Sequence, residues 1–181
     1  MLQSLFSNAR SLATSDEPFV ADMHLAFVCP HVSAIYNYWR SKAQGERLPG
    51  RPDIDPIDLG GSLRYVVLVD VEAAPRRYRY RLVGTHSTEM LDRDFTGRYL
   101  DEVYAPNDLQ NVSDAFERVI RERAPIRYHG AASFAQKHYL QFEAAVMPLA
   151  GDGETVDMLL LGVCYDTLRP PPPEFGSKLS R

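Results

Sequence analysis

Cysteine is scarce in this sequence, and long apolar runs are missing. The 181 residues include two cysteines, Cys29 and Cys164, without CxxC spacing, so the sequence does not encode a disulfide framework. No segment approaches the roughly 18 consecutive apolar residues of a membrane-spanning helix. The first residues lack the charged-then-apolar layout of a secretory signal peptide. We therefore expect a protein of the reducing cytoplasm that has no membrane partner.

Basic residues are not in excess either. The formal net charge is −4, which argues against nucleic-acid binding, because neutralising phosphates requires a basic surface. Four arginines do cluster between residues 76 and 81. They alternate with tyrosines, so we interpret them as the solvated or partner-facing side of one strand.

Recognisable catalytic and cofactor motifs are also missing. Ser87 has no GxSxG surroundings, a CxxCH motif for covalent haem is absent, and no flavin–cysteine motif stands in the chain. His129 and His138 lie on two arms of a predicted hairpin, but the predicted register separates them by on the order of 15 Å. The sequence therefore requires no cofactor and predicts no metal site, and we do not predict an enzyme.

The N-terminal half contains one helix and two strands with clear periodicity. From Pro30 onward, apolar residues recur every three or four positions, which predicts an amphipathic helix ending near residues 45–49. Residues 48–56 form a connector rich in proline and aspartate. Residues 63–71 are apolar on both faces, which is typical of a central strand. Residues 77–84 have one charged face, which is typical of an edge strand.

The C-terminal half completes a mixed α and β pattern. A helix is predicted from Pro106 to about Arg123, followed by a hairpin over residues 126–133 and 138–147. Residues 156–166 are apolar on both faces, so this last strand belongs beside the first one at the centre of a sheet. Residues 169–173 are proline-rich and are expected to adopt a polyproline II conformation.

This order of elements matches the PAS fold, and short motifs add to the likeness. The chain resembles an alphaproteobacterial family of small stand-alone PAS-like proteins, a fifth PAS class, over roughly residues 31–166. The resemblance rests on residues 36–39, 51–56, 78–85, 94–98 and 147–149. Within them, the family-motif positions that we single out are Arg81, Gly84, Thr85, Asp94, Thr96 and Gly97.

The resemblance implies an α+β fold. We expect a PAS-like five-stranded antiparallel sheet with helices on one face and an extra N-terminal amphipathic helix shielding the back. The corresponding division of the chain is an N-terminal arm (1–30), the amphipathic helix and connector (31–62), the PAS-like core (63–168) and a proline-rich tail (169–181). Position 92 departs from the family pattern, which often has glycine there. Asp92 still suits the same turn, because aspartate tolerates left-handed geometry better than most residues.

A small-molecule cavity is the main functional expectation that the resemblance implies. Aromatic and long apolar side chains would converge between the sheet and the helices, whether as a plain core or as the border of a pocket. The predicted lining residues are Tyr80, Leu82, His86, Met90, Phe95, Tyr99, Phe116 and Phe142. For His86 two roles stay open, a ligand or haem contact and a hydrogen bond to backbone at a helix start.

The family likeness also implies self-association through the N-terminal helix, where Tyr36, Tyr38 and Trp39 are the predicted interface residues. We therefore expect a cytoplasmic sensory or regulatory module, without an enzymatic activity of its own, that binds a small ligand or a signalling partner protein and forms a homodimer. Two alternatives stay open: an interaction adaptor whose core is filled by its own side chains, and a small isomerase-like enzyme.

Overall fold

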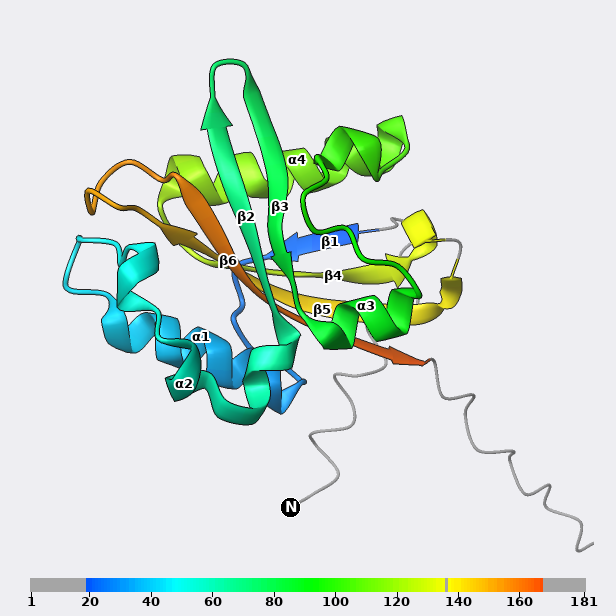
Figure 1. Ribbon diagram of the computed structural model, residues 1–181, viewed down its shortest axis with the longest axis horizontal. Helices are drawn as coiled ribbons and strands as arrows, with labels where there is room; N and C mark the ends of the chain where they lie inside the picture. The colour runs from blue at the N-terminus through cyan, green and yellow to red at the C-terminus, as the bar shows by residue number, and fades with distance from the viewer. Residues whose placement is uncertain (1–18, 136, 168–181) are drawn as a thin grey trace, which may run out of the picture.

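One antiparallel sheet of six strands forms the centre of the protein, in the order β1-β4-β5-β6-β2-β3 (Figure 1). This computed structural model describes residues 19–135 and 137–167. The strands are β1 (Phe19–Asp22), β2 (Val66–Ala73), β3 (Arg76–Val83), β4 (Ile126–Ala132), β5 (Lys137–Leu149) and β6 (Met158–Thr167). The α+β class and the PAS-like antiparallel sheet predicted from the sequence are confirmed.

The first and last long strands lie side by side, as their two apolar faces predict. In the β2–β6 pair, Val67 lies opposite Leu161 and Val69 opposite Leu159. Both strands are buried because the sheet is covered on both sides here. The first strand begins at Val66, not at residue 63, because Gly60–Tyr65 form a 3₁₀ helix (η3).

The sheet has one strand more than predicted. The short strand β1 pairs with β4, and Val20 lies opposite His129. The sheet therefore has six strands where five were predicted, and the additional strand lies in the segment that was assigned to the N-terminal arm (1–30). Four residues are too few for an alternating pattern, so the sequence does not distinguish a strand from the first turns of a helix. Residues 1–18, and all of the predicted tail at 169–181, fall outside the described residues.

Helix α1 (Pro30–Lys42) covers one face of the sheet, as predicted, and packs on β5 and β6. Its buried stripe consists of Val32, Ile35 and Trp39. Gly162 of β6 lies beneath Ile35, and a Cβ placed there would be 3.0 Å from Ile35 Cδ1. This close approach explains why glycine occupies the middle of a central strand.

The remaining helices are short, except for α4. Helices α3 (Thr85–Leu91) and α4 (Pro106–Glu122) pack on the face opposite α1. The single turn α2 (Pro56–Leu59) lies beside α1. Three further 3₁₀ turns complete the described elements: η2 (Arg51–Asp53), η4 (Leu100–Glu102) and η5 (Ser133–Ala135).

Local signals set the helix boundaries. The N-cap Asp55 accepts a hydrogen bond from Ile57 N at 2.9 Å, which caps α2. Helix α4 begins at Pro106 and ends where Arg123 adopts a left-handed conformation, which confirms that prediction. None of the helices in the two described ranges is long and apolar enough to cross a membrane.

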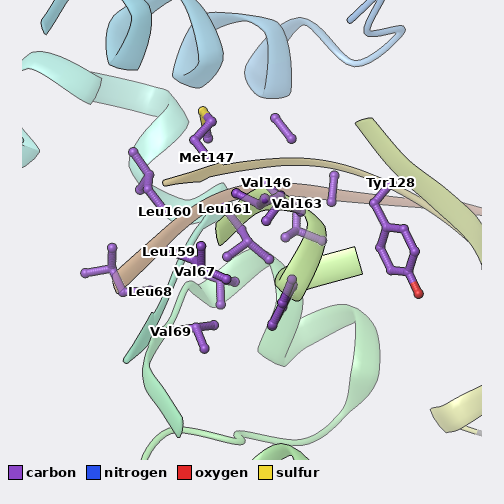
Figure 2. Close-up of a cluster of buried hydrophobic side chains, with 14 of the residues drawn as sticks. Val67, Leu68, Val69, Tyr128, Val146, Met147, Leu159, Leu160, Leu161 and Val163 are labelled. Atoms are coloured by element: carbon purple, nitrogen blue, oxygen red, sulfur yellow. The ribbon is translucent and has the colours of Figure 1, made fainter. Parts of the chain in front are cut away.

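The two faces of the sheet take alternate residues of the same strands. Figure 2 shows Met147 pointing toward α1, while Val69 and Tyr128 point to the opposite side. All three side chains are buried. The helices on that second side do not fill the space completely, and the candidate functional site lies there.

Candidate functional site

A small cavity lies between the sheet and helices α3 and α4. The centre of a water molecule can reach about 50 Å³ of it. Its walls come from five strands (β2 to β6), from helices α3 and α4, from the 3₁₀ turn η5 and from two connecting segments. The lining residues are Val67, Tyr80, Val83, Ser87, Leu91, Phe95, Tyr104, Val112, Phe116, Tyr128, Phe134, Phe142, Ala144, Leu161, Val163 and Tyr165.

Four tyrosines supply polar groups to this otherwise apolar wall. The hydroxyls of Tyr80 and Tyr104 are hydrogen-bonded at 2.8 Å. Burial raises the pKa of Tyr80, Tyr104, Tyr128 and Tyr165 above the ordinary value of 10.0, and the phenols oppose one another's ionisation. All four therefore remain protonated at neutral pH, and each hydroxyl is able to donate a hydrogen bond.

Ser87 adds a further polar atom. It lies in the first turn of α3, and the residue is 2% exposed. Its Oγ has no hydrogen-bond partner among the described residues. Burying a hydroxyl without a hydrogen-bond partner is unfavourable, so its presence in a cavity wall is the most informative feature of the site.

Four of the eight predicted lining residues border the cavity: Tyr80, Phe95, Phe116 and Phe142. The prediction is wrong for Leu82, whose place is taken by Val83. A β-bulge between Leu68 and Val69 in the β2–β3 pairing reverses the alternation after Tyr80. Leu82 consequently points away from the cavity and is 40% exposed.

Tyr99 and Met90 also lie outside the cavity lining. The hydroxyl of Tyr99 donates to Glu72 Oε1 at 2.9 Å, and Arg77 stacks over its ring at 3.6 Å. On α3, Ser87 and Leu91 point to the cavity because they are four residues apart. Met90 lies on a neighbouring side of that helix. Its backbone carbonyl accepts a hydrogen bond from Lys137 Nζ at 2.8 Å.

His86 does not line the cavity, but it contacts a residue that does. Its Nε2 accepts a hydrogen bond from Tyr165 N at 2.9 Å, which is the backbone role considered for this residue. Burial, followed by the nearby Arg64, lowers the pKa of His86 below 6.5. The ring is therefore neutral at neutral pH, as an acceptor nitrogen requires.

A row of aromatic rings leads from the cavity to α1. The ring of His86 lies 6.1 Å from that of Tyr165 and 4.3 Å from that of Tyr65. Tyr65 in turn stacks on His31 of α1 at 4.2 Å. These rings connect the cavity wall with the first turn of the helix on the other face.

The family-motif residues hold the edge of the sheet together. The edge strand β3 is joined to the segment after α3 by the hydrogen bond from Gly97 N to Tyr80 O at 2.6 Å. Thr96 Oγ1 accepts from Val83 N at 3.2 Å, and Asp94 Oδ1 accepts from Thr96 N at 2.8 Å. Arg81 pairs with Asp70 at 3.4 Å. These contacts are structural, and Asp94, Thr96, Gly97 and Arg81 do not line the cavity.

Gly84 and Thr85 form the junction between β3 and α3. A Cβ at Gly84 would lie 2.3 Å from Arg64 O and 2.6 Å from Val66 O, so no other residue fits there. Thr85 O accepts a hydrogen bond from Thr88 Oγ1 within the first turn of the helix. Asp92 ends α3 in a left-handed conformation with φ 53°, in agreement with the prediction for this position.

The three predicted interface residues lie in different environments. Trp39 is 6% exposed, and its Nε1 donates to Pro148 O at 2.9 Å. The assignment of Trp39 to an exposed interface is therefore wrong, because the indole belongs to the core. Tyr38 is partly buried, and its hydroxyl accepts from Asp55 N at 2.8 Å, holding α2 on α1. Tyr36 is partly buried beside Phe27.

The volume of the cavity limits which cofactors could bind in it. Pockets for drug-sized ligands measure roughly 300–1,000 Å³, well above the 50 Å³ that is open here. A haem or a flavin does not fit the cavity in this conformation. Among the described residues, no group of three or more His, Cys, Asp or Glu side chains is arranged to hold a metal ion.

The comparison with protein families agrees with this architecture. A family model described as a PAS domain matches residues 29–164. The chain belongs to the PAS domain family. The match begins one residue before α1, so this helix is included in the matched region of the PAS domain. A comparison with curated proteins finds no match.

Sequence reasoning missed several lining residues of this PAS domain. Tyr165 shares a strand face with Leu161 and Val163, and Tyr128 shares one with Ile126, so strand alternation was a usable signal for both. Tyr104 and Ser87 carry no such signal, because a 3₁₀ turn and a short helix bring them to the cavity.

Proposed function

We propose that this PAS domain binds a small, partly polar molecule in the cavity lined by tyrosines and reports its presence through α1. Membership of the PAS domain family suggests a sensory or regulatory module. The proposal goes further and is supported chiefly by Ser87, whose buried Oγ faces the cavity without a partner. A ligand with one polar group would satisfy this hydroxyl.

The proposed ligand is small and carries a hydrogen-bond acceptor. The four phenols are protonated, one hydroxyl of the Tyr80–Tyr104 pair donates to the other, and the wall is otherwise apolar apart from Ser87. A neutral molecule with a carbonyl, ether or hydroxyl oxygen suits this wall better than a charged one, since burying an unpaired charge is costly. A ligand of more than a few heavy atoms would require α3 or α4 to move outward.

The proposed route to α1 follows the aromatic row. Tyr165 lines the cavity, and its backbone N–H is held by His86 at 2.9 Å. A ligand that displaces Tyr165 would disturb the contact of the His86 ring with Tyr65 and then the stacking of Tyr65 on His31. The output would be a changed position of the first turn of α1, biasing contacts with a partner chain.

Thermal denaturation with a panel of small neutral compounds tests ligand binding. We expect at least one compound to raise the Tm of the wild-type protein, and Ala144→Leu, which fills the cavity, to abolish that rise. Leu82→Ala is the matched control, because Leu82 is 40% exposed and points away from the cavity. A rise that survives Ala144→Leu would place binding elsewhere.

The single tryptophan tests transmission to α1. Trp39 is the only tryptophan of the chain, and its side chain is buried between α1, to which it belongs, and the sheet. A compound that binds in the cavity should change the emission of Trp39, although the indole lies on the other face of the sheet. Binding without any change at Trp39 would contradict the proposed route.

An interaction adaptor is the second candidate, and the small cavity favours it. A space of about 50 Å³ is compatible with a core that never takes a ligand. The adaptor would show no thermal shift with any compound of the panel, and its partner would bind Ala144→Leu as tightly as wild type.

We extend the proposal to self-association at α2. Ile57 is 85% exposed there, two residues after Asp55, whose N–H donates to the hydroxyl of Tyr38 on α1. A homodimer that buries this side chain would be weakened by Ile57→Glu, as measured by light scattering during size-exclusion chromatography. A wild-type protein that elutes as a monomer at all concentrations would contradict the dimer.

A further inference from the structure

The two cysteines of the chain meet at the start of α1. Cys29 is the N-cap residue of this helix, and Cys164 lies on β6. Both cysteines are neighbours of Glu143, which is the strand partner of Cys164 and accepts a hydrogen bond from the backbone N–H of Cys29. Both residues are partly exposed, and both are free thiols in this structure.

The largely buried carboxylate of Glu143 connects the start of α1 to this part of β6. Glu143 lies opposite Cys164 in the β5–β6 register. The same carboxylate accepts hydrogen bonds from Val28 N at 3.0 Å and from Cys29 N at 2.8 Å. Glu143 is itself held by Arg127 at 2.7 Å, and both side chains are nearly buried. The start of α1 is therefore pinned to the strand position beside Cys164.

The surroundings give the two thiols different reactivity. Hydrogen bonding from Cys164, aided by the amides of Val32 and His31, lowers the pKa of Cys29 from 9.0 to about 6. Cys29 itself, followed by burial, raises the pKa of Cys164 above its ordinary value. These opposite shifts favour ionisation of Cys29, at the N-terminus of α1, over ionisation of Cys164, so Cys29 is the more nucleophilic of the two thiols.

We propose that Cys29 and Cys164 form a peroxide-oxidisable pair that closes to a disulfide within one chain. The Cys29 thiolate attacks one oxygen of a hydroperoxide, breaking the O–O bond. After protonation of the leaving oxygen, a sulfenic acid on Cys29 and one water or alcohol result. The Cys164 sulfur then attacks the sulfenic sulfur and loses its proton, and the sulfenic oxygen leaves as water. Two thiols are oxidised by two electrons, and the hydroperoxide is reduced.

The disulfide would join the N-terminus of α1 covalently to the sheet. Cys164 precedes Tyr165, whose side chain lines the cavity, and its Sγ lies 4.0 Å from Tyr165 O. Oxidation would consequently restrain both the proposed output helix and one wall of the cavity. The oxidation chemistry does not depend on a ligand, so it stands or falls separately from the proposed function.

Mass spectrometry of the reduced full chain treated with hydrogen peroxide tests the proposal. We expect the wild type to lose two hydrogens, to resist alkylation at both cysteines, and to yield a cross-linked peptide containing Cys29 and Cys164. In Cys164→Ser, Cys29 should stop at the sulfenic acid and be trapped by dimedone. In Cys29→Ser, oxidation of Cys164 should be at least tenfold slower.

Several outcomes would contradict the proposed oxidisable pair. These are disulfides between two chains, equal oxidation rates in Cys29→Ser and wild type, or no reaction of the wild type with peroxide. Should a serine variant fail to fold, limited alkylation of the wild type by iodoacetamide decides the matter. Peptide mapping must then find Cys29 modified well before Cys164, and the reverse order would refute the assignment.

Discussion

The two faces of the central sheet are built from the same strands, yet they are packed differently. On the α1 face, Ile35 sits over Gly162, and the Trp39 indole is hydrogen-bonded to Pro148 O at 2.9 Å. On the opposite face, helices α3 and α4 leave a cavity of about 50 Å³. Neighbouring positions serve the two sides, since Ala144 lines the cavity and Ala145 lies opposite Gly162.

This difference suggests a division of tasks. A close-packed face transmits displacement, because it has no free volume to absorb a shift. A face with a cavity and a buried hydroxyl without a partner is able to admit a small molecule at low cost. We therefore expect substitutions on the α1 face to reduce stability and substitutions on the cavity face to alter binding.

The largest loss of stability is expected for Trp39→Ala. Truncating a buried tryptophan costs about 3–5 kcal/mol, and the free energy of unfolding from urea denaturation measures it. Trp39→Phe should lose less, because it keeps an aromatic ring in the core, although it removes the donor to Pro148 O and part of the buried ring volume. A cost below about 1 kcal/mol for Trp39→Ala would show that the α1 face is loosely packed.

Glu143→Ala is expected to have the next largest effect. The carboxylate is nearly buried, pairs with Arg127 and accepts the N–H groups of Val28 and Cys29. Removing one partner of a largely buried ion pair should cost about 3 kcal/mol in unfolding free energy. Glu143→Gln keeps an acceptor and should lose less. Equal losses in the two variants would mean that the charge is unimportant.

A matched pair of enlargements compares the two faces directly. Gly162→Val on the α1 face should cost about 2 kcal/mol, because its Cβ would press on Ile35. Ala144→Val on the cavity face should change the unfolding free energy by less than about 1 kcal/mol, since the cavity accepts the added carbons. Similar losses in both variants would contradict the distinction between the faces.

Protonation of His86 should change the free energy of unfolding by less than these substitutions do. Its folded-state pKa lies below the unfolded value of about 6.5, so the unfolded chain binds more protons between these two values. Its contribution to stability is therefore present above pH 6.5 and is lost as pH falls through the folded-state pKa. Unfolding measured between pH 7 and pH 5 should show this loss in the wild type and a weaker one in His86→Gln. Identical pH profiles of the wild type and His86→Gln would show that titration of His86 does not contribute to stability.

The smallest change in stability is expected for Ser87→Ala. Removing a buried hydroxyl that has no partner should leave the unfolding free energy within about 0.5 kcal/mol of wild type, or raise it slightly. Binding of a cavity ligand should nevertheless weaken, as followed by the thermal shift. A clear loss of stability would mean that Ser87 Oγ has a structural partner after all.

Periodicity in the sequence was sufficient to predict the main elements. The adjacency of β2 and β6 and the position of α1 follow from which faces are apolar. The β-bulge near Tyr80 was not foreseeable, because an extra residue in one strand leaves no mark in the alternation of Tyr78, Tyr80 and Leu82. Because of this extra residue, Val83 and not Leu82 faces the cavity.

Other parts of the site depend on contacts between distant segments. The pair of Cys29 and Cys164 joins the two ends of the described chain, and their spacing in the sequence gives no indication of it. His86 and Tyr165 are likewise brought together only by the packing of α3 on β6. Local patterns predict elements, whereas such contacts follow from the fold as a whole.

Native mass spectrometry after incubation with a small-molecule extract of cells tests the central claim most directly. The account predicts a wild-type protein that carries an additional non-covalent mass and an Ala144→Leu variant that remains at its own mass. Wild-type protein that stays free of any bound molecule, or an Ala144→Leu variant that retains the same mass, would contradict it.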